Sequence, residues 1–305
     1  MTHLSISPET VLRSGELSAT IAPAAGGRIT RFTSEEPGAA LDWLVPLADD
    51  QRQAGFEPTA WPKAGCYPLV PFSNRIAEGR FSWAGRSAAL PIHPGEAHAL
   101  HGGAHRAAWR LVRHDAASAT MAYRHARGDQ GWPWSFEVEQ DVRLGDGALA
   151  LTLRITNTDE VEMPCGLGFH PYFPAGFAHR IGFAARTVWA PDADFLGTPP
   201  RALSAAEDYA TPRPLEDVEL TQYYGAWNGQ AVLQGADGAA IRLEADAPLR
   251  HLVLHRPAGR GYFCVEPVSH VANAAHLQAT RADTGWQVLP PGAQREARMV
   301  LRVGR

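Results

Sequence analysis

Glycine and proline are scattered along almost the whole chain, and this feature limits the possible folds more than any other. The 305 residues include 29 glycines and 24 prolines, and neither type is confined to one segment. Both interrupt helices, glycine through its backbone freedom and proline through its missing N–H group. Long helices therefore have little room, and we expect a β-rich fold.

Short segments of alternating side-chain character recur between these interruptions. β-Branched or aromatic residues alternate with other residues in segments that we expect to be strands, at 17–21, 28–33, 119–124, 136–144, 148–157, 231–234 and 240–244. Gly145-Asp146-Gly147 and Asp237-Gly238 are typical of hairpin turns. Only short stretches, such as residues 204–209, resemble helices. The pattern predicts an all-β sandwich with at least a dozen antiparallel strands.

Nothing in the sequence divides the chain into separate units. It has no low-complexity linker and no repeat of fixed period, so we expect a single domain spanning residues 1–305. The first residues do not combine a basic region with an apolar one, and no apolar run approaches the roughly 20 residues of a membrane-spanning helix. We therefore expect a cytoplasmic protein with no membrane partner.

Charge and cysteine content exclude several classes of function. The formal net charge of −4 provides no basic field, so nucleic acid is not an expected partner. Lys63 is the only lysine, which leaves one candidate for Schiff-base or P-loop chemistry. Cys66, Cys165 and Cys264 are widely separated, and this spacing supports neither a disulfide framework nor a cysteine zinc site.

Four histidines lie close together at positions 93, 98, 101 and 105. Their spacing matches neither of the usual local zinc patterns, HExxH and HxH, so we predict no metal site here. We interpret His93, His98 and His105 as solvated loop residues. His101 differs because two glycines follow it, and a glycine backbone can approach a ligand closely.

Two further segments place ionisable side chains among apolar neighbours. His170 lies between aromatic residues and precedes a proline, which fits either a core histidine at a strand end or a general acid on a rigid turn. Glu266 lies between Phe263 and Val268 in an apolar run. A carboxylate is costly to bury there unless it is paired or used. A solvent-facing strand position is the alternative, but the flanking residues favour a function.

Arg75 follows Asn74 between two hydrophobic runs. The planar fork of donors on an arginine can hold a carboxylate or two neighbouring sugar hydroxyls. The alternative is a structural salt bridge with Glu78 or another acid. Trp61 is one of several tryptophans that are more often core residues, although an exposed indole can stack on a sugar ring.

Five short motifs, taken in order, resemble the aldose 1-epimerase (galactose mutarotase) family. They are Asn74-Arg75 with Gly79-Arg80-Phe81, Leu100-His101-Gly102-Gly103, Gly131-Trp132-Pro133-Trp134, Phe169-His170-Pro171-Tyr172-Phe173 and Glu266-Pro267. Each motif is short, but the matching stretches run from about Gly26 to Leu301. The resemblance implies a galactose-mutarotase-like β-supersandwich of antiparallel strands. It also implies an isomerase that interconverts the α and β anomers of a free aldose and needs no cofactor.

The same resemblance assigns roles to individual residues. Glu266 is similar to the family's general base and His170 to its general acid, whereas Arg75, His101 and the adjacent Asn74 look like residues that position the sugar. Opening the ring requires a base at the anomeric hydroxyl and an acid at the ring oxygen. With ordinary pKa values of about 4.3 and about 6.5, we expect an ionised Glu266 and a partly protonated His170.

One position departs from the family pattern. Family members usually carry an aspartate that accepts hydrogen bonds from sugar hydroxyls in the segment that here covers residues 220–227, and an ungapped alignment places Thr221 there. A threonine is a weaker acceptor that can also donate, so we expect a different hydroxyl preference. Asp208 or Asp217 would replace the missing carboxylate if the loop shifts.

Other functions remain open at this point. A hexose-6-phosphate 1-epimerase has the same fold and would hold the phosphate with arginines such as Arg75, Arg80, Arg86 or Arg106, but residues 66–75 look more like the free-sugar branch. A glycoside hydrolase needs two placed carboxylates, and only Glu266 has a convincing context. A non-catalytic carbohydrate-binding protein has no need of an acid–base pair. The sequence does not distinguish a monomer from a homodimer.

Overall fold

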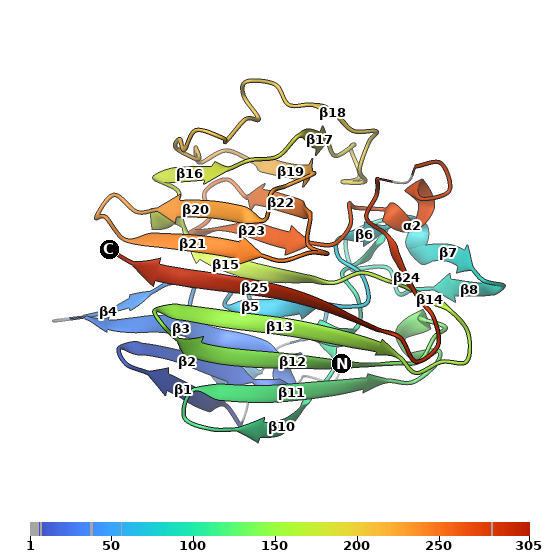
Figure 1. Ribbon diagram of the computed structural model, residues 1–305, viewed down its shortest axis with the longest axis horizontal. Coiled ribbons are helices and arrows are strands. Elements are labelled where there is room, and N and C mark those ends of the chain that lie inside the picture. Colours follow the sequence, from blue (N-terminus) through green and yellow to red (C-terminus); the bar gives the residue numbers. More distant parts are fainter. Residues whose placement is uncertain (1–5, 7, 37–38, 56, 282) are drawn as a thin grey trace.

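Two large β-sheets pack against each other and form most of the protein. The computed structural model describes residues 6, 8–36, 39–55, 57–281 and 283–305. Figure 1 shows one sheet in front of the other, with the strands of both running roughly across the view. Within the described residues every strand pairing in the sheets is antiparallel. The predicted all-β sandwich of antiparallel strands is confirmed.

The larger sheet has eleven strands, ten of them in one row and β4 paired with β3 beside it. The row runs β1 (Thr10–Ser14), β2 (Leu17–Ala22), β3 (Arg28–Glu36), β5 (Cys66–Leu69), β15 (Gly168–Pro174), β23 (Tyr262–Val268), β22 (His251–Arg256), β19 (Leu220–Gly225), β17 (Thr187–Trp189) and β18 (Arg201–Ala202), and β4 is Ala39–Asp42.

The smaller sheet has eight strands, drawn at the front of Figure 1. Their order is β10 (Arg110–His114), β11 (Ser118–His125), β12 (Phe136–Gly145), β13 (Ala148–Asn157), β25 (Gln294–Gly304), β21 (Ala240–Ala245), β20 (Gln230–Gln234) and β16 (Arg180–Phe183).

Three two-stranded sheets and a few short helices complete the described residues. The pairs are β6 (Arg75–Ile76) with β9 (Ala99–Leu100), β7 (Arg80–Trp83) with β8 (Arg86–Ala89), and β14 (Met163–Cys165) with β24 (Gln287–Leu289). The helices are α1 (Asp49–Ala54), α2 (Ala274–Leu277) and the single-turn 3₁₀ helices Pro23–Ala25, Ala77–Gly79, Ala104–Arg106, Asp129–Gly131 and Ala175–Phe177. In this part of the chain no helix is long and apolar enough to cross a membrane.

The two faces of the larger sheet bury different sets of side chains. On β15 and β23, Phe169 and Val265 belong to the main hydrophobic cluster, which also includes Leu151 and Met299 of the smaller sheet. Tyr172 of β15 belongs to a second cluster. Because successive side chains on a strand point to opposite faces, this second cluster lies on the face turned away from the sandwich core.

The sequence predicted most of the long strands correctly. All seven expected segments fall within β2, β3, β11, β12, β13, β20 and β21. Both hairpins form, and Asp146 and Gly147 adopt the positive φ angles, 50° and 70°, that a tight turn between β12 and β13 requires. The glycine-containing turn sequences therefore predicted both hairpins correctly.

The predicted helix at residues 204–209 is wrong, because only one turn forms there. The Glu207 carboxylate accepts hydrogen bonds from the backbone N–H and hydroxyl of Ser204, as at a helix start, but it is also paired with Arg201 at 2.6 Å. Tyr209 is buried and stacks on Phe183 at 5.0 Å. This packing and the hydrogen bond from Phe183 N–H to the Tyr209 carbonyl hold the chain in an extended conformation.

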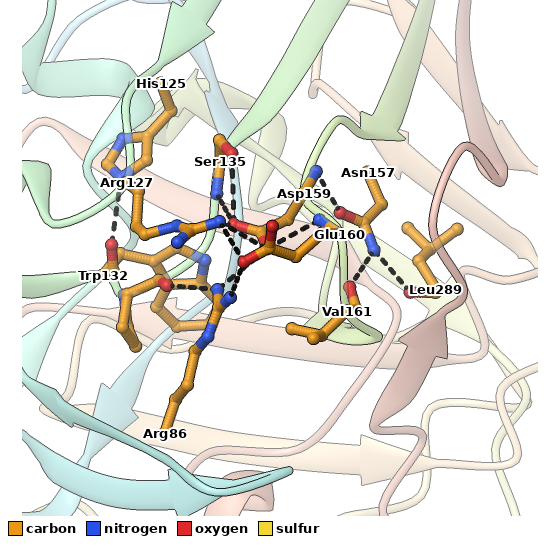
Figure 2. Close-up of polar contacts among 11 residues, drawn as sticks. Arg86, His125, Arg127, Trp132, Ser135, Asn157, Asp159, Glu160, Val161 and Leu289 are labelled. Carbon is orange, nitrogen blue, oxygen red and sulfur yellow. Dashed lines mark hydrogen bonds and ion pairs between the residues drawn. The ribbon is translucent and has the colours of Figure 1, made fainter.

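A buried carboxylate fixes the connection that follows β13. Figure 2 shows Asp159 among Arg86, Arg127 and Ser135, with ion-pair distances of 2.9 Å to Arg86 and 3.1 Å to Arg127. The Asp159 side chain has no exposed surface. Burial alone would raise the pKa of Asp159, but the hydrogen bonds from Arg86, the backbone N–H groups and Arg127 outweigh it and lower that pKa. The ionised carboxylate therefore stabilises the folded state.

We predict that Asp159→Asn lowers the free energy of unfolding at pH 7 by about 2–3 kcal/mol, because both arginines lose their buried partner but still reach water. Since folding depresses the pKa of Asp159, its stabilisation is present above the unfolded pKa of about 3.9 and is lost as the pH falls below it. Urea unfolding at pH 7 and pH 3 measures the effect. Glu160→Gln is the matched control, because Glu160 contacts the same two arginines but is 70% exposed. An equal loss in both variants would contradict this account.

Candidate active site

The register between β15 and β23 places His170 opposite Glu266. Gly168 pairs with Val268, and the same register holds again four residues further along β15, so the midpoint is the His170–Glu266 position. Side chains at one register position point to the same face of a sheet. The Nε2 atom of His170 lies 3.5 Å from Oε1 of Glu266, and both side chains are buried. The two residues singled out independently in the sequence therefore meet.

This pair lines a cavity of about 240 Å³ on the outer face of the larger sheet. The strands of the sheet form its floor, and segments between the strands form its walls. The wall residues include Trp61, Lys63, Asn74, Arg75, His93, Glu96, His101 and Phe195, and the floor includes His170, Thr221, Val253, His255, Tyr262 and Glu266. All six residues predicted to belong to a site line this one cavity. Its volume suits a small polar ligand better than a polymer.

Burial moves the pKa values of the pair in opposite directions. Desolvation raises the pKa of Glu266 to about 8, although Arg75 and Lys63 act to lower it. Desolvation also lowers the pKa of His170 well below its usual value, and Lys63 lowers it further. The expectation of ordinary pKa values was therefore wrong, because it was based on exposed groups. At neutral pH these directions leave one proton on the pair as a whole.

Aromatic rings fix the orientation of His170. Its imidazole stacks against Tyr67 on one strand and Tyr172 on its own strand, with centroid distances of 4.6 Å to each. Trp61 holds the Tyr172 hydroxyl in turn, because its indole N–H donates to that oxygen at 3.2 Å. The rings leave His170 little freedom to turn away from Glu266.

Asn74 and His101 lock each other in place. The backbone N–H of Asn74 donates to Nδ1 of His101 at 3.1 Å, and the backbone N–H of His101 donates to the Asn74 carbonyl at 2.8 Å. Both residues have positive φ angles, 56° and 49°, which cost energy for side chains other than glycine. A Cβ at Gly102 would meet the Val70 carbonyl oxygen at 2.0 Å, so Gly102 permits close backbone packing. Neither Gly102 nor Gly103 lines the cavity.

Arg75 forms a salt bridge and lines the cavity at the same time. Its Nε and Nη2 atoms donate to the two carboxylate oxygens of Glu96 at 2.6 and 2.7 Å, so the partner is Glu96 and not Glu78. The guanidinium also lies 4.7 Å from the centre of the Phe195 ring. Glu96 was not predicted as a site residue, because it lies in a loop among prolines, glycines and histidines without any strand pattern.

Thr221 faces His255 across β19 and β22. The two residues are register partners, and the Thr221 hydroxyl lies 3.0 Å from Nδ1 of His255. Neither Asp208 nor Asp217 lines the cavity, and Asp217 instead pairs with Arg256 at 3.0 Å. Among the described residues, therefore, no carboxylate replaces the missing aspartate on this part of the floor. His255 was not predicted, although its register with Thr221 places it there.

The interpretation of the other histidines as solvated residues is wrong for two of them. His98 and His105 are both buried. Nδ1 of His98 accepts a hydrogen bond from the Glu78 N–H, and His105 stacks on Tyr67 at 4.9 Å. His93 is partly buried and lines the cavity. The rings of His93, His101 and His105 all lie near Trp61, with centroid distances of 5.2, 5.9 and 4.9 Å, but among the described residues they do not form a group of possible metal ligands.

A different trio of possible metal ligands includes the His170–Glu266 pair. Atoms of His170, Cys264 and Glu266 lie within 4.8 Å of one another in the described part of the chain. Cys264 is two residues before Glu266 and shares its face of β23. A thiol must lose its proton to ligate a metal, and desolvation raises the pKa of the Cys264 thiol well above its usual value.

Comparisons with known proteins agree with this architecture. A sequence profile of the family described as aldose 1-epimerase matches residues 9–302. The chain is 35% identical over 251 residues to the uncharacterized protein YphB of Escherichia coli (strain K12), which covers 79% of this chain and 84% of that protein. A crystal structure of a provisionally named aldose 1-epimerase from Escherichia coli K12 superimposes with a TM-score of 0.83 at 28% identity, covering 97% and 98% of the two chains.

The fold assignment extends to more distant proteins. The structure of a galactose mutarotase-like protein from Clostridium acetobutylicum superimposes with a TM-score of 0.85 at 18% identity, covering 97% of this chain and 94% of that chain. The predicted galactose-mutarotase-like fold is confirmed by this match. The resemblance drawn from the five sequence motifs is likewise confirmed by the profile.

We predict that Glu266→Gln raises the melting temperature, and that the increase grows with pH. A raised folded pKa means that Glu266 loses its favourable contribution as the pH rises from the unfolded value of about 4.3 to its folded value of about 8. A glutamine of the same shape has no such dependence. Melting curves of both proteins from pH 4 to pH 9 measure the difference, which should level off above about pH 8. A difference that is the same at every pH would show that Glu266 is not desolvated.

Proposed function

Because the chain belongs to the aldose 1-epimerase family, we propose that it interconverts the α and β anomers of a free aldose. The observation that carries this proposal is the buried His170–Glu266 pair, 3.5 Å apart in a cavity of about 240 Å³. The anomeric hydroxyl and the ring oxygen are bonded to the same carbon. An acid and a base that act on them must therefore lie side by side, as these two residues do.

In the proposed reaction, Glu266 removes the proton of the anomeric hydroxyl while His170 protonates the ring oxygen. The C1–O5 bond breaks and leaves an open-chain aldehyde with the same number of atoms and electrons. Rotation about C1–C2 presents the other face of the carbonyl. The ring then closes with both proton transfers reversed, which gives the other anomer and restores the pair. No group outside the protein and the sugar is needed.

The reactive arrangement of the pair is an ionised Glu266 beside a protonated His170. Burial favours the opposite arrangement in the empty cavity, with the proton on Glu266. Both arrangements hold one proton, so moving it between the side chains requires no exchange with solvent. The positive charge of Arg75 acts to lower the Glu266 pKa and so favours the reactive arrangement, whereas Lys63 lowers the pKa of both Glu266 and His170 and favours neither arrangement.

The remaining predicted site residues are proposed to hold the sugar hydroxyls. The Nη1 group of Arg75 is not occupied by Glu96 and donates one long hydrogen bond, of 3.4 Å, to Oδ1 of Asn74. Asn74 and His101 form the adjoining wall. Thr221 and His255 offer a hydroxyl and an imidazole on the floor, in place of a carboxylate. A neutral pair of this kind can both donate and accept, so it selects hydroxyl positions less strictly than a carboxylate.

The geometry supports the competing functions less well. Arg80, Arg86 and Arg106 do not line the cavity, and Arg86 is paired with Asp159, so the arginines suggested for a phosphate are not collected there. A glycosidase needs a second free carboxyl group. Glu96 lines the cavity, but Arg75 occupies both of its oxygens. A pure binding protein would gain nothing from burying His170 against Glu266.

We predict that Glu266→Gln lowers kcat for anomer interconversion by about 10²–10⁴-fold, since an amide cannot accept the proton. His170→Asn should cause a loss of similar size. Polarimetry with freshly dissolved aldoses measures the rate, and melting curves show whether each variant is folded. His98→Asn is the control, because His98 is buried outside the cavity. A loss smaller than about tenfold in a folded Glu266→Gln protein would remove Glu266 from the mechanism.

We also predict that anomer interconversion is unaffected by EDTA. The Cys264 thiol keeps its proton because of burial, and the His170–Glu266 pair can act without a metal ion. Activity before and after chelation, together with the metal content of the dialysed protein, tests this expectation. Inactivation by EDTA that zinc reverses would place a metal at His170, Cys264 and Glu266.

A further inference from the structure

Lys63, the only lysine of the chain, is not used by the mechanism described above. It lies between α1 and β5, in the segment that forms one wall of the cavity. Its Nζ atom lies 4.6 Å from the centre of the Trp61 ring, and Trp61 lines the same wall. Among the described residues no carboxylate lies within salt-bridge distance of Lys63. The cavity therefore contains a cation without an anionic partner.

The other charged groups of the cavity do not neutralise Lys63. Arg75 and Glu96 are paired with each other, and the His170–Glu266 pair holds one proton in total. Burial lowers the pKa values of the other histidines that line the cavity, His93, His101 and His255. Together these groups add no negative charge, so Lys63 makes the cavity net positive.

Lys63 is exposed to solvent where it lines the cavity, so a ligand can reach its ammonium group directly. Desolvation lowers the pKa of Lys63 and the charge of Arg28 lowers it further, whereas Cys264, Glu266 and Glu96 act to raise it. An anion at the ammonium group would favour the charged form of Lys63, and a neutral sugar hydroxyl would not.

Resting on the proposed function, we propose that the substrate is an aldose that carries a carboxylate, a uronic acid, and that Lys63 binds the carboxylate. One unpaired monovalent cation matches one carboxylate. A phosphate carries more charge and is usually held by several donors, yet none of Arg80, Arg86 and Arg106 lines the cavity. The volume of about 240 Å³ suits a single sugar unit. Lys63 is thus the residue that determines specificity.

The first test compares matched sugars. The wild-type protein should show kcat/KM values about 10–100-fold higher for glucuronate or galacturonate than for glucose or galactose, which is the effect of one charged hydrogen bond. Lys63→Met should remove this preference and leave the values for neutral sugars within about threefold. Lys63→Arg should retain most of the preference. Arg110→Met is the control, because Arg110 is exposed on β10 and does not line the cavity.

The outcomes separate carboxylate recognition from its alternatives. A wild-type preference for glucose 6-phosphate over glucuronate would overturn the assignment to a carboxylate. Equal kcat/KM values for glucose and glucuronate would overturn it as well. An equal loss for both sugars in Lys63→Met would show that Lys63 acts only through the Glu266 pKa. In that last case the proposed epimerase function stands, while the inference about Lys63 fails.

The second test measures binding without turnover. Reductive methylation with ¹³C-formaldehyde keeps the charge of an amine, and a single lysine gives one side-chain NMR signal. Glucuronate should shift this signal and raise the pKa of the labelled lysine, whereas glucose should leave that pKa unchanged. A response to glucuronate in a protein that interconverts no anomers would support the binding site and refute the epimerase function. The absence of any response to glucuronate would refute the binding site.

Discussion

The antiparallel pairing of β15 with β23 is the interaction on which the site depends. This pairing sets His170 opposite Glu266, and the alternation of side chains sends both to the face away from the sandwich core. A shift of the register by one residue would exchange them for apolar neighbours such as Phe169 and Val265. The packing of those neighbours between the two large sheets therefore fixes the position of the proposed acid–base pair. Loops from other parts of the chain only need to enclose a pair that the sheet has already formed.

Burial shifts the pKa values of His170 and Glu266, and it is also unfavourable for the stability of the folded protein. The same desolvation that raises the pKa of Glu266 lowers that of His170, so the pair retains one proton and can pass it across 3.5 Å. An exposed pair would have ordinary pKa values and would lose the protonated histidine near neutral pH. The folded protein carries this unfavourable burial because well-satisfied charges elsewhere, such as Asp159 between Arg86 and Arg127, stabilise the scaffold.

The sequence was sufficient to predict the long strands, and the residues that it singled out line one cavity, but it did not predict their surroundings. Alternation and turn residues predicted β12 and β13 because both signals are local. The motifs indicated His170 and Glu266, yet their pKa shifts depend on burial, which the sequence alone does not give. Glu96 and His255 were missed because their roles arise from contacts across long separations, with Arg75 and Thr221. The predicted helix near Ser204 failed because the stacking of Tyr209 on Phe183 outweighed a local capping signal.

The most direct test of the shared proton is the pH dependence of kcat/KM for anomer interconversion by the wild-type protein. A pair that retains one proton across neutral pH should give a constant value through pH 6.5, and the value should fall above about pH 8 as the pair loses that proton. A value that already declines between pH 6 and pH 7 would indicate a histidine with an ordinary pKa. That result would contradict the claim that burial of His170 against Glu266 determines the chemistry.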